Sequence, residues 1–237
     1  MNKKAVAALV SLVLILLAGY GLFRLSKSRT FQFFGGLTDR VRTEQKVAAL
    51  TFDDGPSEYS DEVVDILAEK NAKATFYLIG QNIEEYPDQV KNIIERGNEI
   101  GNHSYSHPTF IFRPFLFVDA EIAKTNDLIR GAGYRGEITF RPPGGKKLIV
   151  LPWYLQQHKI KTIMWNVEPD TYVAGNAEAI VSYTLENTKP GSIILLHPFC
   201  KTQCEADREA LPKIIDGLRS QGYTFVTIED LLSYSTN

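Results

Sequence analysis

The sequence has no excess of either charge: 26 lysine and arginine residues face 28 aspartate and glutamate residues, and the formal net charge is -2. This balance gives no reason to expect nucleic acid as a partner. No repeat period and no low-complexity tract is visible, so solenoid folds and flexible linkers are set aside. With 237 residues and 44% hydrophobic content, the chain fits one sizeable globular domain with a short extension, and we expect a monomer.

Long apolar runs are absent except at the N-terminus, where residues 5–23 carry no charge. In a helix this run reaches about 28 Å, close to the ~30 Å hydrocarbon core of a bilayer. The run is longer than the apolar part of a signal peptide, and its cleavage site is weak. No cysteine follows it closely, which argues against a lipoprotein anchor. We predict an uncleaved signal anchor, a transmembrane helix, over residues 1–25; the alternative is secretion after signal-peptide cleavage.

The rest of the chain divides into a membrane-proximal tether, residues 26–45, and a main globular domain, residues 46–237. The tether contains three phenylalanines, Phe31, Phe33 and Phe34, which either sit at the bilayer interface or cap the bottom of the domain. Basic residues flank both ends of the apolar run, so the positive-inside rule alone leaves the orientation of the helix open.

From residue 47 onward, apolar strands alternate with amphipathic helices. This order predicts an α/β fold with a parallel sheet and helices outside. We expect an irregular (β/α) barrel of about seven strands, with a doubly wound open sheet as the competing architecture. The expected strands are 47–52, 74–79, 99–102, 138–140, 160–165, 192–196 and 224–226. The expected helices are 60–70, 87–96, 119–130, 148–158, 177–187 and 211–221.

Two adjacent carboxylates, Asp53 and Asp54, end the first expected strand and are followed by Gly55-Pro56. In a parallel strand-and-helix fold, reactive groups collect at the carboxyl ends of the strands. Neighbouring side chains at such an end point in different directions, so the two aspartates can take separate tasks. Taken alone, Asp54-Gly55 suits an ordinary turn equally well.

Two of the four histidines, His103 and His107, lie four residues apart after the third expected strand. This spacing brings two imidazoles within reach of one ion. Two histidines and one carboxylate make a common catalytic zinc set that leaves a position open for water, and Asp54 is the natural third ligand. The alternative is that both histidines are ordinary polar loop residues.

A stiff, glycine-containing loop follows the fourth expected strand. Its Pro142-Pro143 pair removes two backbone donors, and Gly144 lets the backbone come close to a ligand. Arg141 is placed to pair with Asp53 and hold it ionised. The alternative is a rigid surface turn with a solvated arginine.

A third histidine, His197, closes the apolar strand over residues 192–196. Such a histidine is often a satisfied core residue. Here it leaves the strand at the edge where the other polar clusters lie, and Asp170 is available to accept its ring N–H and orient it.

These motifs, taken in order, resemble those of the polysaccharide deacetylases, the NodB-homology enzymes of carbohydrate esterase family 4. The resemblance covers roughly residues 47–228. It implies an irregular (β/α) barrel that binds a divalent metal, zinc or another such as cobalt, and removes acetyl groups from N-acetylated glycans. The motifs are Thr51-Phe-Asp-Asp-Gly-Pro56, His103-Ser-x-x-His-Pro108, Arg141-Pro-Pro-x-Gly145, the Trp165-to-Asp170 segment and Leu195-Leu-His197.

The resemblance also implies a role for each matching residue. Asp53 corresponds to the catalytic base, His197 to the catalytic acid and Asp170 to the carboxylate that tunes this acid. Asp54, His103 and His107 correspond to the metal ligands. Arg141 corresponds to the residue that positions the base.

Around the expected substrate pocket, the chain departs from the family twice. Gly144 stands where an aromatic is frequent, but its backbone N–H remains available to an oxyanion. Thr171 stands where the family often has a tryptophan, and Tyr172 is a candidate substitute. Pro143 and Trp165 complete the residues that we expect near substrate.

Cys200 and Cys204 are the two cysteines, four residues apart and just after His197. In an oxidising compartment such a pair can form a disulfide that stiffens the rim beside the acid. Free thiols are the alternative.

The expected substrate is an N-acetylated glycan: peptidoglycan, an exopolysaccharide or a chitin-like oligosaccharide. In bacteria such glycans lie outside the cytoplasm, so we expect the domain there, tethered to the cell membrane by the N-terminal helix. Two alternatives remain: an esterase for O-acetyl groups, and a membrane-tethered glycan-binding module on the same fold.

Overall fold

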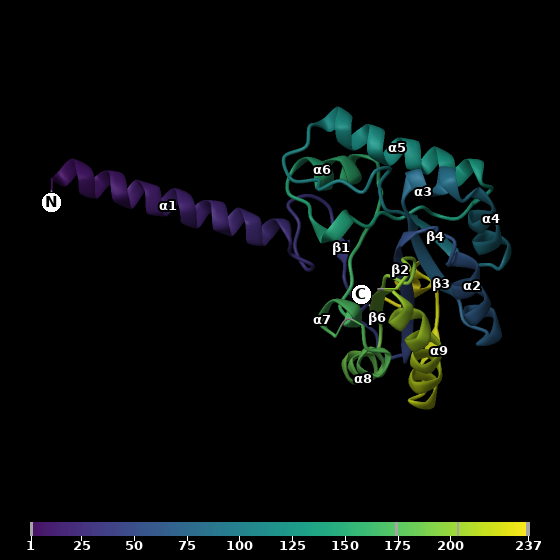
Figure 1. Ribbon diagram of the computed structural model, residues 1–237. Coiled ribbons are helices and arrows are strands. Elements are labelled where there is room, and N and C mark those ends of the chain that lie inside the picture. Colours follow the sequence, from purple (N-terminus) through teal and green to yellow (C-terminus); the bar gives the residue numbers. More distant parts are fainter. Residues whose placement is uncertain (1, 174, 203, 236–237) are drawn as a thin grey trace.

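The computed structural model describes residues 2–173, 175–202 and 204–235. Short parallel strands form the centre of the domain, helices cover the outside, and helix α1 extends far from it (Figure 1). The strands are β1 (Leu37–Thr38), β2 (Val47–Gly55), β3 (Ala74–Leu78), β4 (Glu99–Asn102), β5 (Thr162–Ile163), β6 (Ser192–Leu196) and β7 (Thr224–Phe225). The helices are α1 (Lys3–Ser26), α2 (Ser60–Glu69), α3 (Gly80–Glu85), α4 (Pro87–Glu95), α5 (Phe115–Gly131), the 3₁₀ turn η1 (Pro143–Gly145), α6 (Val150–Gln157), α7 (Pro169–Tyr172), α8 (Ala177–Asn187), α9 (Glu205–Ser220) and α10 (Ile228–Ser233).

The hydrogen-bonded neighbours of β2 connect into a closed circuit. β2 pairs in parallel with β3 and with β6, and β3 pairs with β4. Single parallel bridges continue from Asn102 of β4 to Phe140 and on to Thr162 of β5, and another joins Val167 to Ile194 of β6. The parallel α/β class is therefore confirmed, and the circuit is that of an irregular barrel rather than of a doubly wound open sheet.

Several expected elements differ in extent from those observed. The expected strand 138–140 is reduced to isolated parallel bridges at Phe140, to Asn102 on one side and to Thr162 on the other. Helix α9 begins at Glu205, six residues before the expected start, although Pro212 lies inside it. Buried Leu211, Ile214 and Leu218 share one face of α9, so packing of this face against the core outweighs the local cost of the proline.

The predicted tether folds onto the domain over part of its length. Within residues 26–45, Leu37 and Thr38 form β1, which pairs in parallel with β5. Phe31, Phe33 and Phe34 remain exposed. The chain between α1 and β2 therefore contributes to the folded domain.

Strand β2 sends alternate side chains to opposite faces. Leu50 and Phe52 lie in the main core between sheet and helices, whereas Val47 and Ala49 belong to the smaller cluster inside the barrel. Asp53 follows the inward series and is buried, at 2% exposure. This alternation explains why the first of the two aspartates points into the barrel.

Helix α1 is long and apolar enough to cross a membrane over residues Leu9–Ser26. Its 24 residues correspond to about 36 Å of helix. The apolar side chains of this helix are exposed, from Leu9 to Leu25, and the helix projects beyond the domain (Figure 1). Water solvates this apolar surface poorly. Insertion of the helix into a bilayer, or a role as a secretion signal, would account for it.

Candidate active site

The motif residues converge on one cavity of about 290 Å³ at the carboxyl ends of the strands. It combines carboxylates, imidazoles and a glycine loop with two basic residues from the segment after α1. The lining residues are Lys27, Arg29, Asp53, Asp54, His103, His107, Gly144, Gly145, Trp165, Glu168, Thr171 and His197.

Asp53 is held by a fully buried arginine. Nη1 of Arg141 donates to Oδ1 of Asp53 at 2.8 Å and also to the Thr51 hydroxyl at 2.8 Å. The guanidinium lies 4.1 Å from the centroid of the Tyr77 ring, beneath the cavity. A buried charge is tolerated only when it is paired and hydrogen-bonded. Arg141 therefore fixes one oxygen of Asp53, while the other, Oδ2, lies 3.6 Å from Nε2 of His103.

A bulge brings the adjacent Asp54 into the same cavity. The pairing of β2 with β3 shifts register between Asp53 and Gly55, which leaves Asp54 as an extra residue in β2. Asp54 has φ 71°, an unfavourable backbone conformation for a non-glycine residue. Bulges of this kind re-aim side chains and are frequent next to active sites. The two aspartates thus share a cavity although adjacent strand residues normally diverge.

Asp54 and the two histidines form a three-residue cluster with the geometry of a metal site. The Nε2 atoms of His103 and His107 lie 3.5 and 3.2 Å from Oδ1 of Asp54, and the candidate ligand atoms all lie within 4.8 Å of one another. Two imidazole nitrogens and a carboxylate oxygen are a donor set that suits zinc and related divalent ions.

The donor and acceptor roles of the atoms in this cluster indicate whether it suits a metal ion. His103 Nδ1 lies 2.8 Å from the Arg141 carbonyl, which only accepts, so Nδ1 carries the proton and Nε2 of the neutral ring offers a lone pair. Oδ1 of Asp54 is buried without a hydrogen-bond donor. An oxygen and a nitrogen lone pair therefore face each other, an arrangement that a cation satisfies.

The electrostatics of the cluster keep Asp54 ionised. Burial opposes the charged form, but hydrogen bonds from His103 and His107, when these rings are protonated, outweigh it and hold the pKa of Asp54 well below its usual range. The hydrogen bond to Asp54 raises the pKa of His107 in return. The site therefore attracts positive charge, whether protons on the rings or a bound ion.

Backbone strain gathers at the same place. Among the described residues, the non-glycine positions with positive φ include Asp54 at 71°, Ser104 at 70° and His107 at 54°. The hydroxyl of Ser104 accepts the N–H of His107 at 3.1 Å, and the Ser104 N–H donates to Asn102 Oδ1 at 2.7 Å. Such strain persists only where the surroundings over-determine the conformation, and it is typical of functional sites.

His197 and Asp170 form a tight pair at the other predicted position. Nδ1 of His197 lies 2.6 Å from Oδ2 of Asp170, and the same oxygen accepts the backbone N–H of His197 at 3.0 Å. Burial disfavours the charged ring, but the bond to Asp170 and the nearby charges of Asp53 and Asp54 outweigh it and raise the pKa of His197 to about 10. The imidazole ring of His197 is therefore protonated at neutral pH. Burial and the charge of Asp170 also raise the pKa of the Asp207 carboxyl to about 7.

Of the residues expected around substrate, Gly144 and Trp165 line the cavity and two others do not. Pro143 is buried in η1 and supports the loop from behind. Tyr172 is 59% exposed and stacks on Tyr183 with ring centroids 5.6 Å apart, so Thr171 takes the place at the wall. The stacking partner, Tyr183 in α8, determines which way the Tyr172 side chain points. The residues next to Tyr172 in the sequence give no sign of this contact.

A comparison with known families decides the membership of the chain. The family model for polysaccharide deacetylases matches residues 40–167, more than half of the chain. The chain belongs to this family. The resemblance carried by the five sequence motifs is thereby confirmed.

Known polysaccharide deacetylases are similar in sequence or structure to this chain over most of its length. A peptidoglycan-N-acetylglucosamine deacetylase of Bacillus cereus is 37% identical over 190 residues, which are 79% of this chain and 68% of that protein. A crystal structure of a peptidoglycan N-acetylglucosamine deacetylase bound to a hydroxybenzamide matches with a TM-score of 0.78 and 33% identity, over 83% of this chain and 92% of that one.

A non-catalytic member of the carbohydrate esterase family 4 fold is also similar. The structure of a pseudoenzyme from Bacillus anthracis matches with a TM-score of 0.77 and 27% identity, over 86% of this chain and 72% of that one. The deacetylase fold alone therefore does not fix activity, which depends on the side chains in the cavity.

Sequence reasoning missed three residues of this polysaccharide deacetylase cavity: Lys27, Arg29 and Glu168. Nη2 of Arg29 lies 2.5 Å from Oε2 of Glu168, across 139 positions of sequence. Glu168 directly precedes α7, which carries Asp170. The position of Glu168 in the segment between Trp165 and Asp170 was a usable signal, whereas the basic residues after α1 read as ordinary flanking charges of a membrane helix.

The disulfide candidates lie beside the cavity. The structure joins Cys200 and Cys204 by a disulfide with a Cα–Cα distance of 5.2 Å. Arg208 of α9 donates to the carbonyl of Cys200 at 2.7 Å and to that of Pro198 at 2.7 Å. The segment that follows His197 is thus fastened to α9.

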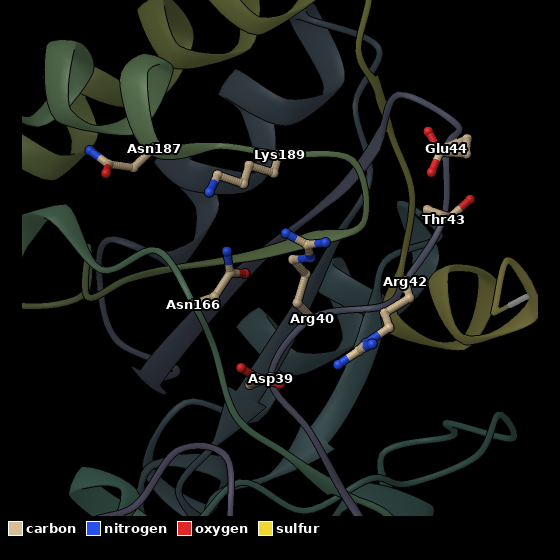
Figure 2. A pocket seen from close by; sticks show the side chains of 8 residues that line it. All are labelled: Asp39, Arg40, Arg42, Thr43, Glu44, Asn166, Asn187 and Lys189. Atoms are coloured by element: carbon tan, nitrogen blue, oxygen red, sulfur yellow. The ribbon is translucent and has the colours of Figure 1, made fainter.

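A larger hollow of about 670 Å³ lies elsewhere and contains none of the predicted site residues (Figure 2). Arg40 bridges to Ser192, the first residue of β6, so this hollow lies at the amino end of a strand whose carboxyl end leads to His197. It is open and polar, without a histidine among its lining residues, which are Asp39, Arg40, Arg42, Thr43, Glu44, Asn166, Asn187 and Lys189. Size therefore does not identify the reactive cavity here, and the convergence of motifs does.

Proposed function

We propose that the chain is a metal-dependent hydrolase that removes acetyl groups from the N-acetylated sugars of a peptidoglycan-type glycan. The observation that carries the proposal is that Asp53, His197 and the three candidate ligands line one cavity, with Asp53 paired to Arg141 and His197 paired to Asp170. The activity in the name of the Bacillus cereus relative supports the choice of substrate. Each residue then has a chemical task.

Asp54, His103 and His107 would hold the divalent ion, zinc in our proposal. Bound there, such an ion supplies positive charge that polarises an acetyl carbonyl and makes water more acidic. His103 keeps its Nε2 turned to the site because the Arg141 carbonyl holds the opposite ring nitrogen. A hydrogen bond of this kind fixes both the tautomer and the orientation of a ligand.

Asp53 is the general base in this proposal. It accepts a proton from the water that attacks the acetyl carbon, while Arg141 holds its Oδ1 and keeps the carboxylate aimed. A positioned base of this kind contributes about 10²–10⁴-fold. The second oxygen, Oδ2, lies 3.6 Å from Nε2 of His103, so the base sits beside the ligand cluster.

His197 is the general acid. An amide resists hydrolysis because its amine leaves poorly unless it is protonated. The carboxylate of Asp170 keeps the His197 ring charged, so the ring can give its Nε2 proton to the sugar nitrogen as the C–N bond breaks. The products are acetate and the free amine of the sugar.

Gly144 and its neighbours form the wall that receives the acetyl group. The φ of 55° at Gly144 favours glycine, and the backbone N–H of this loop is our candidate donor to the developing oxyanion. One such donor is worth about 3–4 kcal/mol of transition-state stabilisation. Trp165 and Thr171 complete the wall.

We further propose that α1 anchors the protein in the cell membrane with the domain outside the cytoplasm, where such glycans lie. The apolar helix supports this placement, with secretion after cleavage as the alternative.

The test is acetate release by the full chain in neutral detergent, with zinc, from N-acetylglucosamine oligomers and from an O-acetylated oligosaccharide. We expect acetate from the N-acetyl substrate, and Asp53→Asn to lower the rate at least 10²-fold. Release from the O-acetyl substrate alone would identify an esterase. Tight glycan binding without release from either substrate would point to a non-catalytic module like the pseudoenzyme neighbour.

A further inference from the structure

The segment that follows α1 forms one wall of the active-site cavity. Lys27 and Arg29 line the same cavity as Asp53 and His197, although both lie in the predicted tether. We propose that this wall is a substrate-binding element and that Lys27 binds a carboxylate carried by the glycan. The proposal rests on the function proposed above and specifies which glycans the site prefers.

One buried lysine fastens the segment on both sides of Lys27. Lys147 is 1% exposed; its backbone N–H donates to the carbonyl of Ser26 at 2.9 Å, and its Nζ donates to the carbonyl of Ser28 at 2.5 Å. A buried ammonium requires such an acceptor, because an unpaired charge in the interior is costly. Lys147 lies two residues after Gly145, so these bonds tie the segment to the glycine loop that also lines the cavity.

Arg29 is held in place and its charge is already matched. Its guanidinium forms the ion pair with Glu168, which is only 7% exposed, and lies 4.9 Å from the centroid of the Trp165 ring. These contacts join the segment to the stretch that carries Asp170. Arg29 is therefore a positioning residue for the wall rather than a free anion-binding group.

The charges that line the cavity leave Lys27 without a carboxylate. Asp53 pairs with Arg141, Glu168 pairs with Arg29, and Asp54 faces the two histidines. The Lys27 ammonium lies over the ring of Phe23 in α1, 4.1 Å from the ring centroid. Within the described part of the chain, no carboxylate contacts Lys27.

Trp165 adds no accessible donor to the cavity. It is 4% exposed and its ring lines the cavity, but Nε1 is itself buried and therefore out of reach of a ligand there. Of the two basic side chains in the segment after α1, Lys27 is therefore the one available to a ligand.

The ligand that this chemistry fits is a glycan whose N-acetylated sugars carry carboxylates. A neutral homopolymer offers nothing that pairs with Lys27. Because Lys27 is solvent-exposed, its ion pair with substrate is expected to be modest and to weaken with salt. We therefore expect a preference of about two- to fivefold at low ionic strength, expressed in KM rather than in kcat.

The experiment compares two probes on the zinc-loaded full chain in neutral detergent, where no anionic lipid competes for Lys27. One probe is a tetrasaccharide of N-acetylglucosamine; the other alternates N-acetylglucosamine with N-acetylmuramic acid and so carries carboxylates. Acetate release gives kcat and KM, and calorimetry gives Kd for each probe independently of turnover. The variants are Lys27→Gln, Lys27→Glu and Lys27→Arg, with Arg24→Gln as the control, an exposed cation of the same helix end that contacts Tyr20.

We expect Lys27→Gln to raise KM and Kd for the carboxylated probe about two- to fivefold and to leave the neutral probe unchanged. Lys27→Glu should have a larger effect, Lys27→Arg and Arg24→Gln little effect, and 0.5 M salt should abolish the difference. Equal losses on both probes, or no loss, would overturn the proposal. Lys27-dependent binding of the carboxylated probe without acetate release would uphold it while refuting the proposed function.

Discussion

The backbone carbonyl of Arg141 lies 2.8 Å from Nδ1 of His103, while the guanidinium of the same residue holds Asp53. One residue thus orients a candidate metal ligand through its main chain and the candidate base through its side chain. Substitution separates these two tasks, because it removes the side chain and leaves the carbonyl.

We predict that Arg141→Lys retains the metal but lowers turnover at least 10²-fold. Lysine keeps a positive charge near Asp53 but lacks the planar fork that reaches Asp53, Thr51 and the Met164 carbonyl together. Metal content by mass spectrometry and acetate release would be measured on the same preparation. A variant that loses metal and activity together would contradict the separation of the two tasks.

The pair formed by His197 and Asp170 gives a pH-dependent prediction. Burial lowers the pKa of His197, but the hydrogen bond to Asp170 and the negative charges of Asp170, Asp53 and Asp54 outweigh it and raise the pKa to about 10. The acid therefore stays protonated through the neutral range, and we expect activity to fall as alkaline pH deprotonates it. In Asp170→Asn the hydrogen bond and the charge that favour the protonated ring are lost, which lowers the pKa. The alkaline limb of kcat/KM should therefore move to lower pH.

The measurement is a pH–rate profile of Asp170→Asn beside the unsubstituted chain, with Asp230→Asn in α10 as a surface control. An alkaline limb that stays in place in Asp170→Asn, whatever the loss in rate, would show that His197 is not the group whose proton controls turnover.

Metal binding should depend on His103 and not on histidines elsewhere. His103→Ala removes one of the three candidate ligands, so we expect loss of both bound zinc and acetate release. His158→Ala is the matched control, since His158 stacks on Tyr154 with ring centroids 4.0 Å apart and lies outside the cavity. Retention of stoichiometric zinc in His103→Ala would mean that the ion binds elsewhere.

Glu99 gives a stability prediction that is independent of the metal. Burial raises the pKa of Glu99 to about 7, despite hydrogen bonds from the Glu229 N–H and the Thr75 hydroxyl, and its Oε1 has no partner. A raised folded-state pKa means that the folded chain binds the proton more tightly than the unfolded chain. The contribution of this group is therefore complete below its unfolded pKa near 4.5 and is lost as pH rises through about 7.

In Glu99→Gln the group no longer titrates. Between pH 5 and pH 9, we expect the free energy of unfolding of the unsubstituted chain to fall more than that of Glu99→Gln. The difference between the two falls should be on the order of 3 kcal/mol. Denaturant titration of both proteins at the two pH values gives this difference, and Glu137→Gln, an exposed carboxylate paired with Lys161, serves as control. Parallel pH dependences would rule out a buried, titrating Glu99.

The clustering of the candidate site residues was predictable because they sit at strand ends within short motifs. Asp53 and Asp54 end β2, His103 and His107 follow β4, and His197 follows β6. In a parallel fold the carboxyl ends of the strands lie at one edge, so residues that end or follow different strands are expected to lie close together. The bulge that turns Asp54 into the same cavity as Asp53 was not predictable, because it depends on the register with β3.

The remaining walls of the cavity depend on contacts that sequence spacing does not encode. Arg29 meets Glu168 only because the segment after α1 folds back across the barrel, and Tyr172 turns away because Tyr183 offers a stacking partner. Both outcomes are decided by tertiary packing rather than by local pattern. For this reason the substrate-facing rim differed most from expectation, while the strand-end residues agreed with it.

The most direct test of the account is to titrate zinc into the metal-free full chain while recording bound zinc per chain and the rate of acetate release from an N-acetylglucosamine oligomer. We predict that the rate rises in proportion to occupancy, reaches its plateau at one ion per chain, and stays near zero in His103→Ala at every zinc concentration. Full turnover by the metal-free chain, or a plateau that His103→Ala also reaches, would contradict it.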